Sequence, residues 1–224
     1  MQLNPAQQNA VEHNEGPLLI LAGPGSGKTR VLVQRIVRLV EAGKARPSQI
    51  LAVTFTNKAA SEIRGRIESL IGNSARELAA GTFHSTGLKL LRSHPEALGY
   101  GERFLVYDDS DSMALVKECL SALNLDEKRL PPRSVLEKIS RAKDSCLNPQ
   151  QFAAKTIGNI YLEKIATVYE RYQKRLLELQ AMDFGDLLFN AVKLFENNPH
   201  ILSSYQNRWK YILVDEYQDT IHSQ

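Results

Sequence analysis

The sequence predicts an α/β fold, with a parallel sheet and an all-helical domain inserted between two of its strands. Short, continuous apolar runs at residues 50–54, 79–83 and 211–214 are typical of strands buried on both faces. A further apolar run at 18–22 leads into a glycine-rich loop, a pattern that predicts strand, loop and helix in succession. Between residues 85 and 207 the pattern is almost wholly helical, so a helical domain separates two strands of one sheet.

Bulk composition fits a globular protein with a real core. The chain has 224 residues, of which 43% are hydrophobic and 24% charged. Its formal net charge of +3 permits binding to a polyanion without demanding it. Cys119 and Cys146 lie in no metal-binding or disulfide pattern. The N-terminal residues do not resemble a secretion signal, and no apolar run has membrane-spanning length, so we expect a cytoplasmic protein without a membrane partner.

The first element is a short helix from Pro5 to about Asn14. Asn4 supplies a typical N-cap, and proline is favoured at the first helical position. This helix places Gln7 and Gln8 beside the first predicted strand.

The loop after residues 18–22 has the composition of a phosphate cradle. Glycines let backbone N–H groups turn toward phosphate oxygens, a lysine neutralises charge, and a hydroxyl can hold Mg²⁺. The strict pattern has glycine at the position of Ala22, where a small residue also fits. A chance glycine-rich turn is the alternative, but strand, loop and a helix over 28–41 occur in the required order. The loop therefore predicts a nucleoside triphosphate ligand bound by Ala22, Gly23, Pro24, Gly25, Ser26, Gly27, Lys28 and Thr29.

Helices are predicted throughout the insert, with Pro131–Pro132 and Asn148–Pro149 marking turns. We expect residues 1–86 to form the first part of the sheet domain, 87–197 the helical insert and 198–224 the continuation of the sheet domain. The candidate helices lie near 85–94, 109–123, 132–144, 160–180, 184–196 and 200–207.

Two adjacent carboxylates, Asp215 and Glu216, follow the strand at 211–214. Ligands of open α/β sheets bind at the carboxyl ends of the strands. Asp215 is therefore a candidate Mg²⁺ ligand, directly or through water, and Glu216 a candidate base for the water that attacks the γ-phosphate. The alternative is a solvated acid pair at a strand end, and the phosphate loop disfavours it.

Polar and aromatic residues follow the other two strands. Phe55 with Asn57 and Lys58 suits a single nucleic-acid strand, because aromatic rings stack on bases and polar groups hold phosphates. Taken alone, Phe55 is more often a core residue, and Asn57 is more often a helix cap. Residues 82–85 are equally ambiguous, since Thr82 or Ser85 can cap the next helix and His84 can be satisfied locally.

The insert contains a basic stretch and two isolated acids. The basic stretch can contact nucleic-acid phosphates, but a solvated helix face is the favoured interpretation. We interpret Asp183 as an N-cap and Asp186 as a first-turn charge that complements the helix dipole. The basic residues are Lys128, Arg129, Arg133, Lys138, Arg141 and Lys143, opposed mainly by Glu137.

Six segments in order resemble motifs of superfamily 1 DNA helicases of the Rep, UvrD and PcrA type. They span nearly the whole chain, which makes the resemblance specific. It implies a RecA-like P-loop NTPase sheet, called subdomain 1A, with a helical insertion called 1B. The segments are residues 3–7, 22–30, 53–60, 82–85, 183–188 and 215–220.

The resemblance also implies roles for individual residues. Gln7 would read adenine through its amide, and Arg30 would pack near the base or ribose. Lys28 and Glu216 would be catalytic, and Thr29 and Asp215 would hold Mg²⁺ beside ATP. Single-stranded DNA would lie on Phe55, Asn57, Lys58, Thr82, Phe83 and His84.

Helicases of this kind continue for several hundred residues beyond the acidic motif. Their arginine fingers and second motor domain lie there, and so does a strand that separates the phosphate-loop strand from the acidic strand. We therefore expect a sheet incomplete at its C-terminal end, and a chain that binds ATP but barely hydrolyses it. The parent would move 3′ to 5′ on single-stranded DNA, act at duplex junctions in replication or repair, and need its C-terminal motor half. Ile221 and His222 depart from the family pattern, which puts local coupling between ATP and DNA in question.

Two other functions remain open from the sequence. One is a non-catalytic, truncated relative that binds nucleotide or single-stranded DNA as a regulator. The other is a subunit of a nuclease-coupled helicase, although this sequence contains no nuclease motif.

Overall fold

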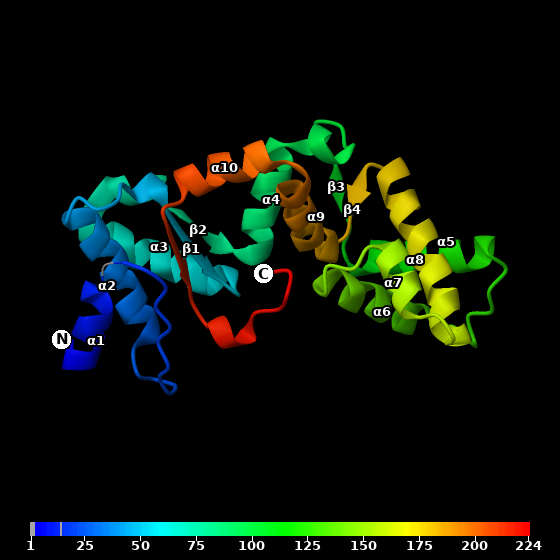
Figure 1. Ribbon diagram of the computed structural model, residues 1–224, viewed down its shortest axis with the longest axis horizontal. Coiled ribbons are helices and arrows are strands. Elements are labelled where there is room, and N and C mark those ends of the chain that lie inside the picture. The colour runs from blue at the N-terminus through cyan, green and yellow to red at the C-terminus, as the bar shows by residue number, and fades with distance from the viewer. Residues whose placement is uncertain (1–2, 14) are drawn as a thin grey trace. The chain divides into compact units, whose positions relative to one another are not determined.

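A three-stranded parallel sheet forms the centre of one part of the molecule. The computed structural model describes residues 3–13 and 15–224. The strands are β1 (Ile50–Thr54), β2 (Ala79–Thr82) and β5 (Tyr211–Val214), in the order β2–β1–β5 (Figure 1). Leu51 of β1 lies opposite Ala79 of β2 and Ile212 of β5. The predicted parallel sheet is confirmed, and every residue of its central strand is buried.

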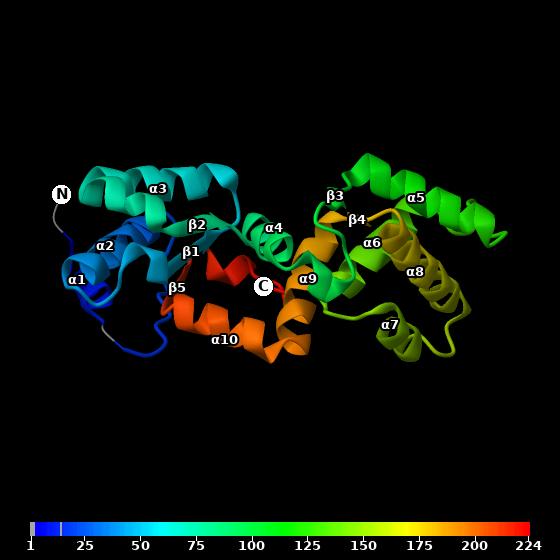
Figure 2. The ribbon, with the colours of Figure 1, turned by 90° about the horizontal axis from the view of Figure 1, so that it is seen from above.

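Helices cover this sheet through a common apolar core (Figure 2). They are α2 (Lys28–Glu41) and α3 (Asn57–Ile71), and α1 (Pro5–Glu12) packs against α2. The 3₁₀ turn Pro47–Gln49 leads into β1, and the 3₁₀ turn Gly72–Glu77 precedes β2. Ile36 of α2 and Ile63 of α3 pack with Ile50 at the start of β1. This packing holds α2 and α3 against β1.

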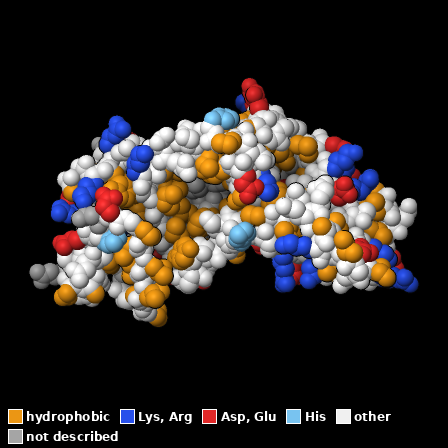
Figure 3. Space-filling model, in the orientation of Figure 1, with side chains coloured by type: hydrophobic (Ala, Val, Ile, Leu, Met, Phe, Trp, Pro, Cys, Tyr) orange, Lys and Arg blue, Asp and Glu red, His pale blue; other side chains and the backbone are white. Residues whose placement is uncertain are grey.

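The strand predicted at residues 18–22 is wrong. This segment has no regular secondary structure, and Leu21 is 86% exposed. Figure 3 shows hydrophobic side chains at the lower left of the molecule, where this segment runs. No strand of the described sheet lies beside this segment, so its N–H and C=O groups form no ladder. Among the described residues only β1 pairs with β5, and Ile212 at the open edge is 63% exposed.

The helical region contains seven helices within the described part of the chain. Helices α5, α6, α8, α9 and α10 agree with their predicted positions within two residues. Helix α4 begins at Phe83, so β2 ends one residue earlier than predicted. Helix α7 and a two-stranded parallel pair, β3 and β4, were not predicted from the sequence. The bounds are α4 (Phe83–Ser93), the 3₁₀ turn Pro95–Leu98, β3 (Leu105–Val106), α5 (Asp109–Ala122), α6 (Pro132–Asp144), α7 (Pro149–Lys155), α8 (Ile160–Glu178), β4 (Ala181–Met182), α9 (Phe184–Asn197) and α10 (Pro199–Arg208).

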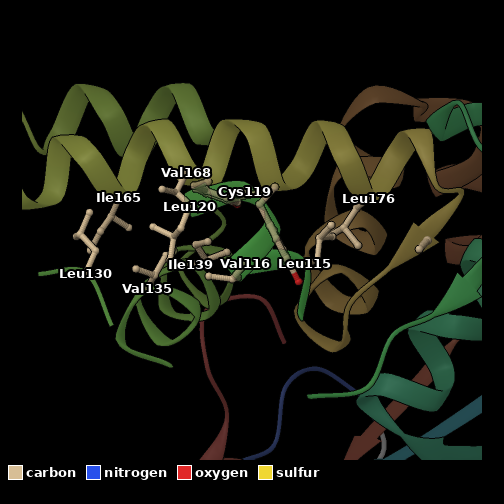
Figure 4. Close-up of a cluster of buried hydrophobic side chains, with 14 residues drawn as sticks. Leu115, Val116, Cys119, Leu120, Leu130, Val135, Ile139, Ile165, Val168 and Leu176 are labelled. Carbon is tan, nitrogen blue, oxygen red and sulfur yellow. The ribbon is translucent and has the colours of Figure 1, made fainter. Parts of the chain in front are cut away.

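A second apolar core lies among α5, α6 and α8. Figure 4 shows α8 running across side chains that α5 and α6 contribute. Val116, Val135, Ile139 and Val168 are fully buried there. The helical region therefore has a core of its own.

Lys143 does not belong to the exposed basic stretch. It is fully buried, and its Nζ lies 2.7 Å from Asp183 Oδ2 and 2.8 Å from Asp186 Oδ1. Asp183 is the predicted N-cap of α9, with its Oδ1 accepting from the backbone N–H of Asp186 at 2.9 Å. Both carboxylates are buried because they share this ammonium, a partnership that the local sequence does not indicate.

The chain divides into two compact units. The sheet unit comprises Met1–Thr86 and Ser203–Asp219, and the helical unit comprises Gly87–Leu202 and Thr220–Gln224. The expected domain boundaries at residues 86, 197 and 224 stay a prediction. The last five residues group with the helical unit, where the Ser223 N–H donates to the Asp144 carbonyl at 3.1 Å.

Among the described residues, none of the helices combines the length and apolar character that crossing a bilayer requires.

Candidate nucleotide-binding site

The loop before α2 has the backbone conformation of a phosphate cradle. Gly25 and Gly27 have φ values of +73° and +88°, in the left-handed region that glycine adopts readily. Gly27 is the N-cap of α2, and the Ser26 N–H donates to the Gly23 carbonyl at 3.3 Å. The loop is exposed and precedes a 14-residue helix. Free N–H groups and the dipole at such a helix start favour an anion.

Lys28 folds back over this loop. Its Nζ donates to the carbonyls of Ala22 and Gly23 at 3.2 and 3.3 Å. These bonds hold the ammonium beside the backbone that would surround a phosphate. An anion entering the loop replaces two neutral acceptors with charged ones, and charge-assisted hydrogen bonds are the stronger kind.

Thr29 and Asp215 meet although 186 residues separate them in the sequence. The Thr29 hydroxyl donates to Asp215 Oδ2 at 3.1 Å. Asp215 is only 6% exposed, and its N–H donates to Val53 O at 2.9 Å, which extends the pairing of β5 with β1. The tertiary fold thus brings together the two residues predicted to hold the metal.

The donors at this point suit Mg²⁺. A hydroxyl and a carboxylate are oxygen ligands, and Mg²⁺ in nucleotide sites takes few protein ligands besides waters and phosphates. The described residues contain no group of three histidine, cysteine or acidic side chains that could hold a metal ion. The hydroxyl–carboxylate pair suits a cation whose remaining ligands are waters and the phosphates of a nucleotide.

Glu216 follows Asp215 but has different partners. Its φ is +53°, an uncommon conformation for a residue with a side chain. Glu216 lies two residues beyond Val214, where β5 ends. Its carboxylate accepts from Gln218 Nε2 at 2.5 Å, whereas its N–H donates to Asp215 Oδ1 at 3.2 Å. The two adjacent carboxylates therefore have different hydrogen-bond partners, Thr29 for Asp215 and Gln218 for Glu216.

The amide of Gln7 is engaged at both atoms. Its Oε1 accepts from the Asn4 N–H at 2.9 Å, which completes a capping box on α1. Its Nε2 donates to Ser26 O in the phosphate loop at 2.9 Å. Gln7 thus lies at the loop, as expected for a residue near the nucleotide. These bonds use one of its two N–H donors and one of its two acceptor lone pairs, so the predicted contact with adenine can form beside them. Arg30 is half-buried in the first turn of α2, and its role stays a prediction.

The aromatic residues predicted to contact DNA lie together. The Phe55 and Phe83 rings follow β1 and β2, with centroids 5.5 Å apart in an edge-to-face arrangement. Asn57 and Lys58 are exposed in the first turn of α3. Asn57 is not the helix cap, because Thr56 Oγ1 accepts from the Ala59 N–H at 3.1 Å. Asn57 is therefore not occupied by capping.

Thr82 and Ser85 cap the start of α4, which was one of the two interpretations that the sequence left open. The Ser85 N–H donates to Thr82 Oγ1 at 3.1 Å, and the Thr82 N–H donates to Ser85 Oγ at 2.9 Å. These reciprocal bonds start α4 directly after β2. His84 is half-buried between them, and burial lowers its pKa. Phe83 and His84 take no part in this pair of bonds.

Arg35, near the site on α2, is a buried charged residue that the sequence did not single out. It lies on α2 between buried Val33 and Ile36, and it is 9% exposed. Its guanidinium donates to backbone carbonyls at the end of α1. A charged residue on an otherwise apolar helix face was the signal in the sequence.

Comparison with known proteins places this geometry in context. The chain matches the family model described as "UvrD/REP helicase N-terminal domain" over residues 3–224. It is 45% identical over 222 residues to the ATP-dependent DNA helicase PcrA of Bacillus subtilis, covering 99% of this chain and 30% of that relative. It is 47% identical over 221 residues to a probable DNA helicase II homolog of Rickettsia felis, covering 97% and 33%. The chain therefore spans about a third of the length of these curated relatives.

Proposed function

Because the chain belongs to the UvrD/REP helicase N-terminal domain family, we propose that it is the ATP-binding N-terminal portion of an ATP-dependent DNA helicase. The observation that carries this proposal is the 3.1 Å hydrogen bond between Thr29 and Asp215. It joins the phosphate loop to the acidic strand end, which is the arrangement that nucleotide hydrolysis with Mg²⁺ requires.

Each residue of the cradle then has a defined task. N–H groups of the loop bind phosphate oxygens, and Lys28 neutralises their charge. Thr29 and Asp215 would hold Mg²⁺, which when bound supplies charge neutralisation at the β- and γ-phosphates. Glu216 accepts a proton from the water that attacks the γ-phosphorus. Gln7 and Arg30 bind the adenine and ribose side.

Single-stranded DNA is the proposed second ligand of the sheet unit. Phe55 and Phe83 offer ring faces or edges to bases, and Asn57 and Lys58 supply polar and cationic groups for the phosphates. His84 adds a further polar contact. The pairing of the two rings at the ends of adjacent strands supports this assignment, since the sequence alone left each of them ambiguous. Movement from 3′ to 5′ and action at duplex junctions are proposed for the parent protein from the family resemblance.

The chain by itself is proposed to bind ATP and hydrolyse it very slowly. The family resemblance implies arginine fingers in a further motor domain, and the relatives are about three times as long. An arginine finger contributes about 10³- to 10⁵-fold to nucleotide hydrolysis. Turnover should therefore depend on that further domain.

ATP hydrolysis by the purified chain tests this function, with and without single-stranded DNA and beside Glu216→Gln. We expect measurable ATP binding, turnover near background, and little effect of DNA or of the substitution. Addition of the remaining motor domain should produce DNA-stimulated turnover, which Glu216→Gln abolishes. DNA-stimulated turnover by the chain alone would contradict the need for the further domain. DNA binding that does not depend on ATP, with no ATP turnover after the remaining motor domain is added, would instead identify a non-catalytic regulator.

A further inference from the structure

Helix α1 carries Gln7 to the phosphate loop but has little apolar anchoring of its own. Of its eight residues only Val11 is buried. A two-turn helix is unstable in isolation, so contacts with the rest of the protein must hold it in place. The position of Gln7 therefore depends on what fixes α1.

Arg35 of α2 supplies a polar anchor at the C-terminal end of α1. Its Nη1 donates to Ala10 O at 3.1 Å and also to His13 O. The last carbonyls of a helix have no partners within the helix and carry its negative dipole end. One buried guanidinium thus satisfies two such carbonyls and places a cation at the favourable end of the helix.

The opposite end of α1 is attached to the phosphate loop. Gln7 Nε2 donates to Ser26 O at 2.9 Å, and a Cβ atom built on Gly27 would lie 3.2 Å from the same nitrogen. Because α2 begins at Lys28, the loop and Arg35 belong to one continuous stretch separated by two helical turns. Helix α1 therefore lies beside α2 with an attachment at each end (Figure 2).

We propose that Arg35 is a positioning residue of the nucleotide site, which fixes α1 on α2 and so holds the Gln7 amide where the base of a purine nucleoside triphosphate binds. This inference rests on the proposed ATP-binding function. Arg35 acts through α1, so it contributes to recognition of the base and not to binding of the triphosphate. The phosphate cradle is built from α2 and its own loop, which keep their contacts with the sheet when Arg35 is changed.

We expect a change at Arg35 to weaken binding of the base and to leave binding of the triphosphate unchanged. Equilibrium dissociation constants are measured for ATP, GTP and inorganic tripolyphosphate with the full 224-residue chain. Arg35→Met should raise the Kd of ATP about tenfold and remove most of the discrimination between ATP and GTP. The reason is that a displaced Gln7 amide loses its hydrogen bonds to the base. The Kd of tripolyphosphate should stay within about twofold, since no phosphate contact is changed.

Two comparison variants make the test specific. Arg38→Met removes an exposed arginine from the last turn of the same helix and should leave all three constants unchanged. Arg35→Lys keeps a cation that can donate to the same carbonyls, and it should restore part of the discrimination. If Arg35→Met does not fold, Arg35→Lys against Arg38→Met provides the same comparison at smaller amplitude.

A double-mutant cycle with Gln7→Ala identifies the route of the effect. If Arg35 acts through Gln7, the double variant should show little more loss of ATP affinity than Gln7→Ala alone. Additive losses, or equal losses for ATP and tripolyphosphate, would overturn the positioning role. Failure of the unmodified chain to bind ATP, or an unchanged Kd in Lys28→Ala, would instead overturn the proposed function on which it rests.

Discussion

Replacing Lys143 with methionine should destabilise the helical unit strongly. The ammonium is fully buried and lies within 2.8 Å of both Asp183 and Asp186. Methionine retains much of the aliphatic stem, so the loss comes mainly from leaving two buried carboxylates without their cation. Breaking a buried ion pair by removing one partner costs about 3–5 kcal/mol.

Several hydrogen bonds remain around the carboxylates and limit the loss. The Tyr172 hydroxyl still donates to Asp183 Oδ2 at 2.9 Å, and Gln173 Nε2 to Asp186 Oδ1 at 3.0 Å. These donors solvate the acids partly, which places the expected loss toward about 3 kcal/mol at pH 7.5.

The destabilisation should depend on pH, with a sign fixed by the pKa values. Burial and the neighbouring Asp183 raise the pKa of Asp186 to about 6, so its contribution to stability falls as pH rises from about 4 to 6. Burial by itself would raise the pKa of Asp183, but the neighbouring ammonium of Lys143 lowers this pKa below 3.8. Asp183 therefore stabilises the fold above that pH. Without Lys143 both pKa values rise, because burial is no longer offset. The variant should therefore recover stability relative to the unmodified chain as pH falls from 7.5 to 5.

Urea denaturation followed by circular dichroism at both pH values measures this. Arg141→Met is the matched control on the same helix, because Arg141 forms an exposed pair with Glu137 that is worth less than about 1 kcal/mol. A Lys143→Met variant within about 1 kcal/mol of the unmodified chain, or a deficit that does not shrink at pH 5, would refute the reasoning.

Other changes test the packing and the metal pair. Gly87→Ala would place a Cβ atom 2.6 Å from the backbone oxygen of Leu187, so we expect a loss of about 2 kcal/mol or more in the same denaturation assay. Gly65→Ala has nothing within 4 Å and lies inside α3, so it should stabilise by about 0.5–1 kcal/mol; equal effects of these two substitutions would contradict the packing argument. Thr29→Ala should weaken ATP binding about tenfold in the presence of Mg²⁺ and much less in EDTA, as measured by titration calorimetry. An equal loss in both buffers would remove Thr29 from the metal site.

Local sequence patterns predicted much of the secondary structure and the parts of the site. Strands β1 and β5 and helices α2 and α6 have the predicted bounds, because apolar continuity and helical periodicity are properties of short windows. The N-caps Asn4 and Asp183 were identified for the same reason. Glycines in the phosphate loop, the following lysine and the acidic pair are likewise readable from their order.

Where a local sequence pattern was compatible with more than one environment, only the tertiary structure determined which environment the residues have. Residues 18–22 have the composition of a strand, but a strand needs a neighbour for its N–H and C=O groups, and the described sheet supplies none there. Lys143 has the neighbours of a solvated lysine in sequence, yet two acids forty residues away make its burial possible. The meeting of Thr29 with Asp215 and of Arg35 with the end of α1 also depends on distant segments. The sequence by itself determined which chemical groups this protein carries and the elements on which they lie, because those follow from local propensity. Only the folded chain determined which groups meet, because burial, pairing and charge compensation are properties of neighbours in space.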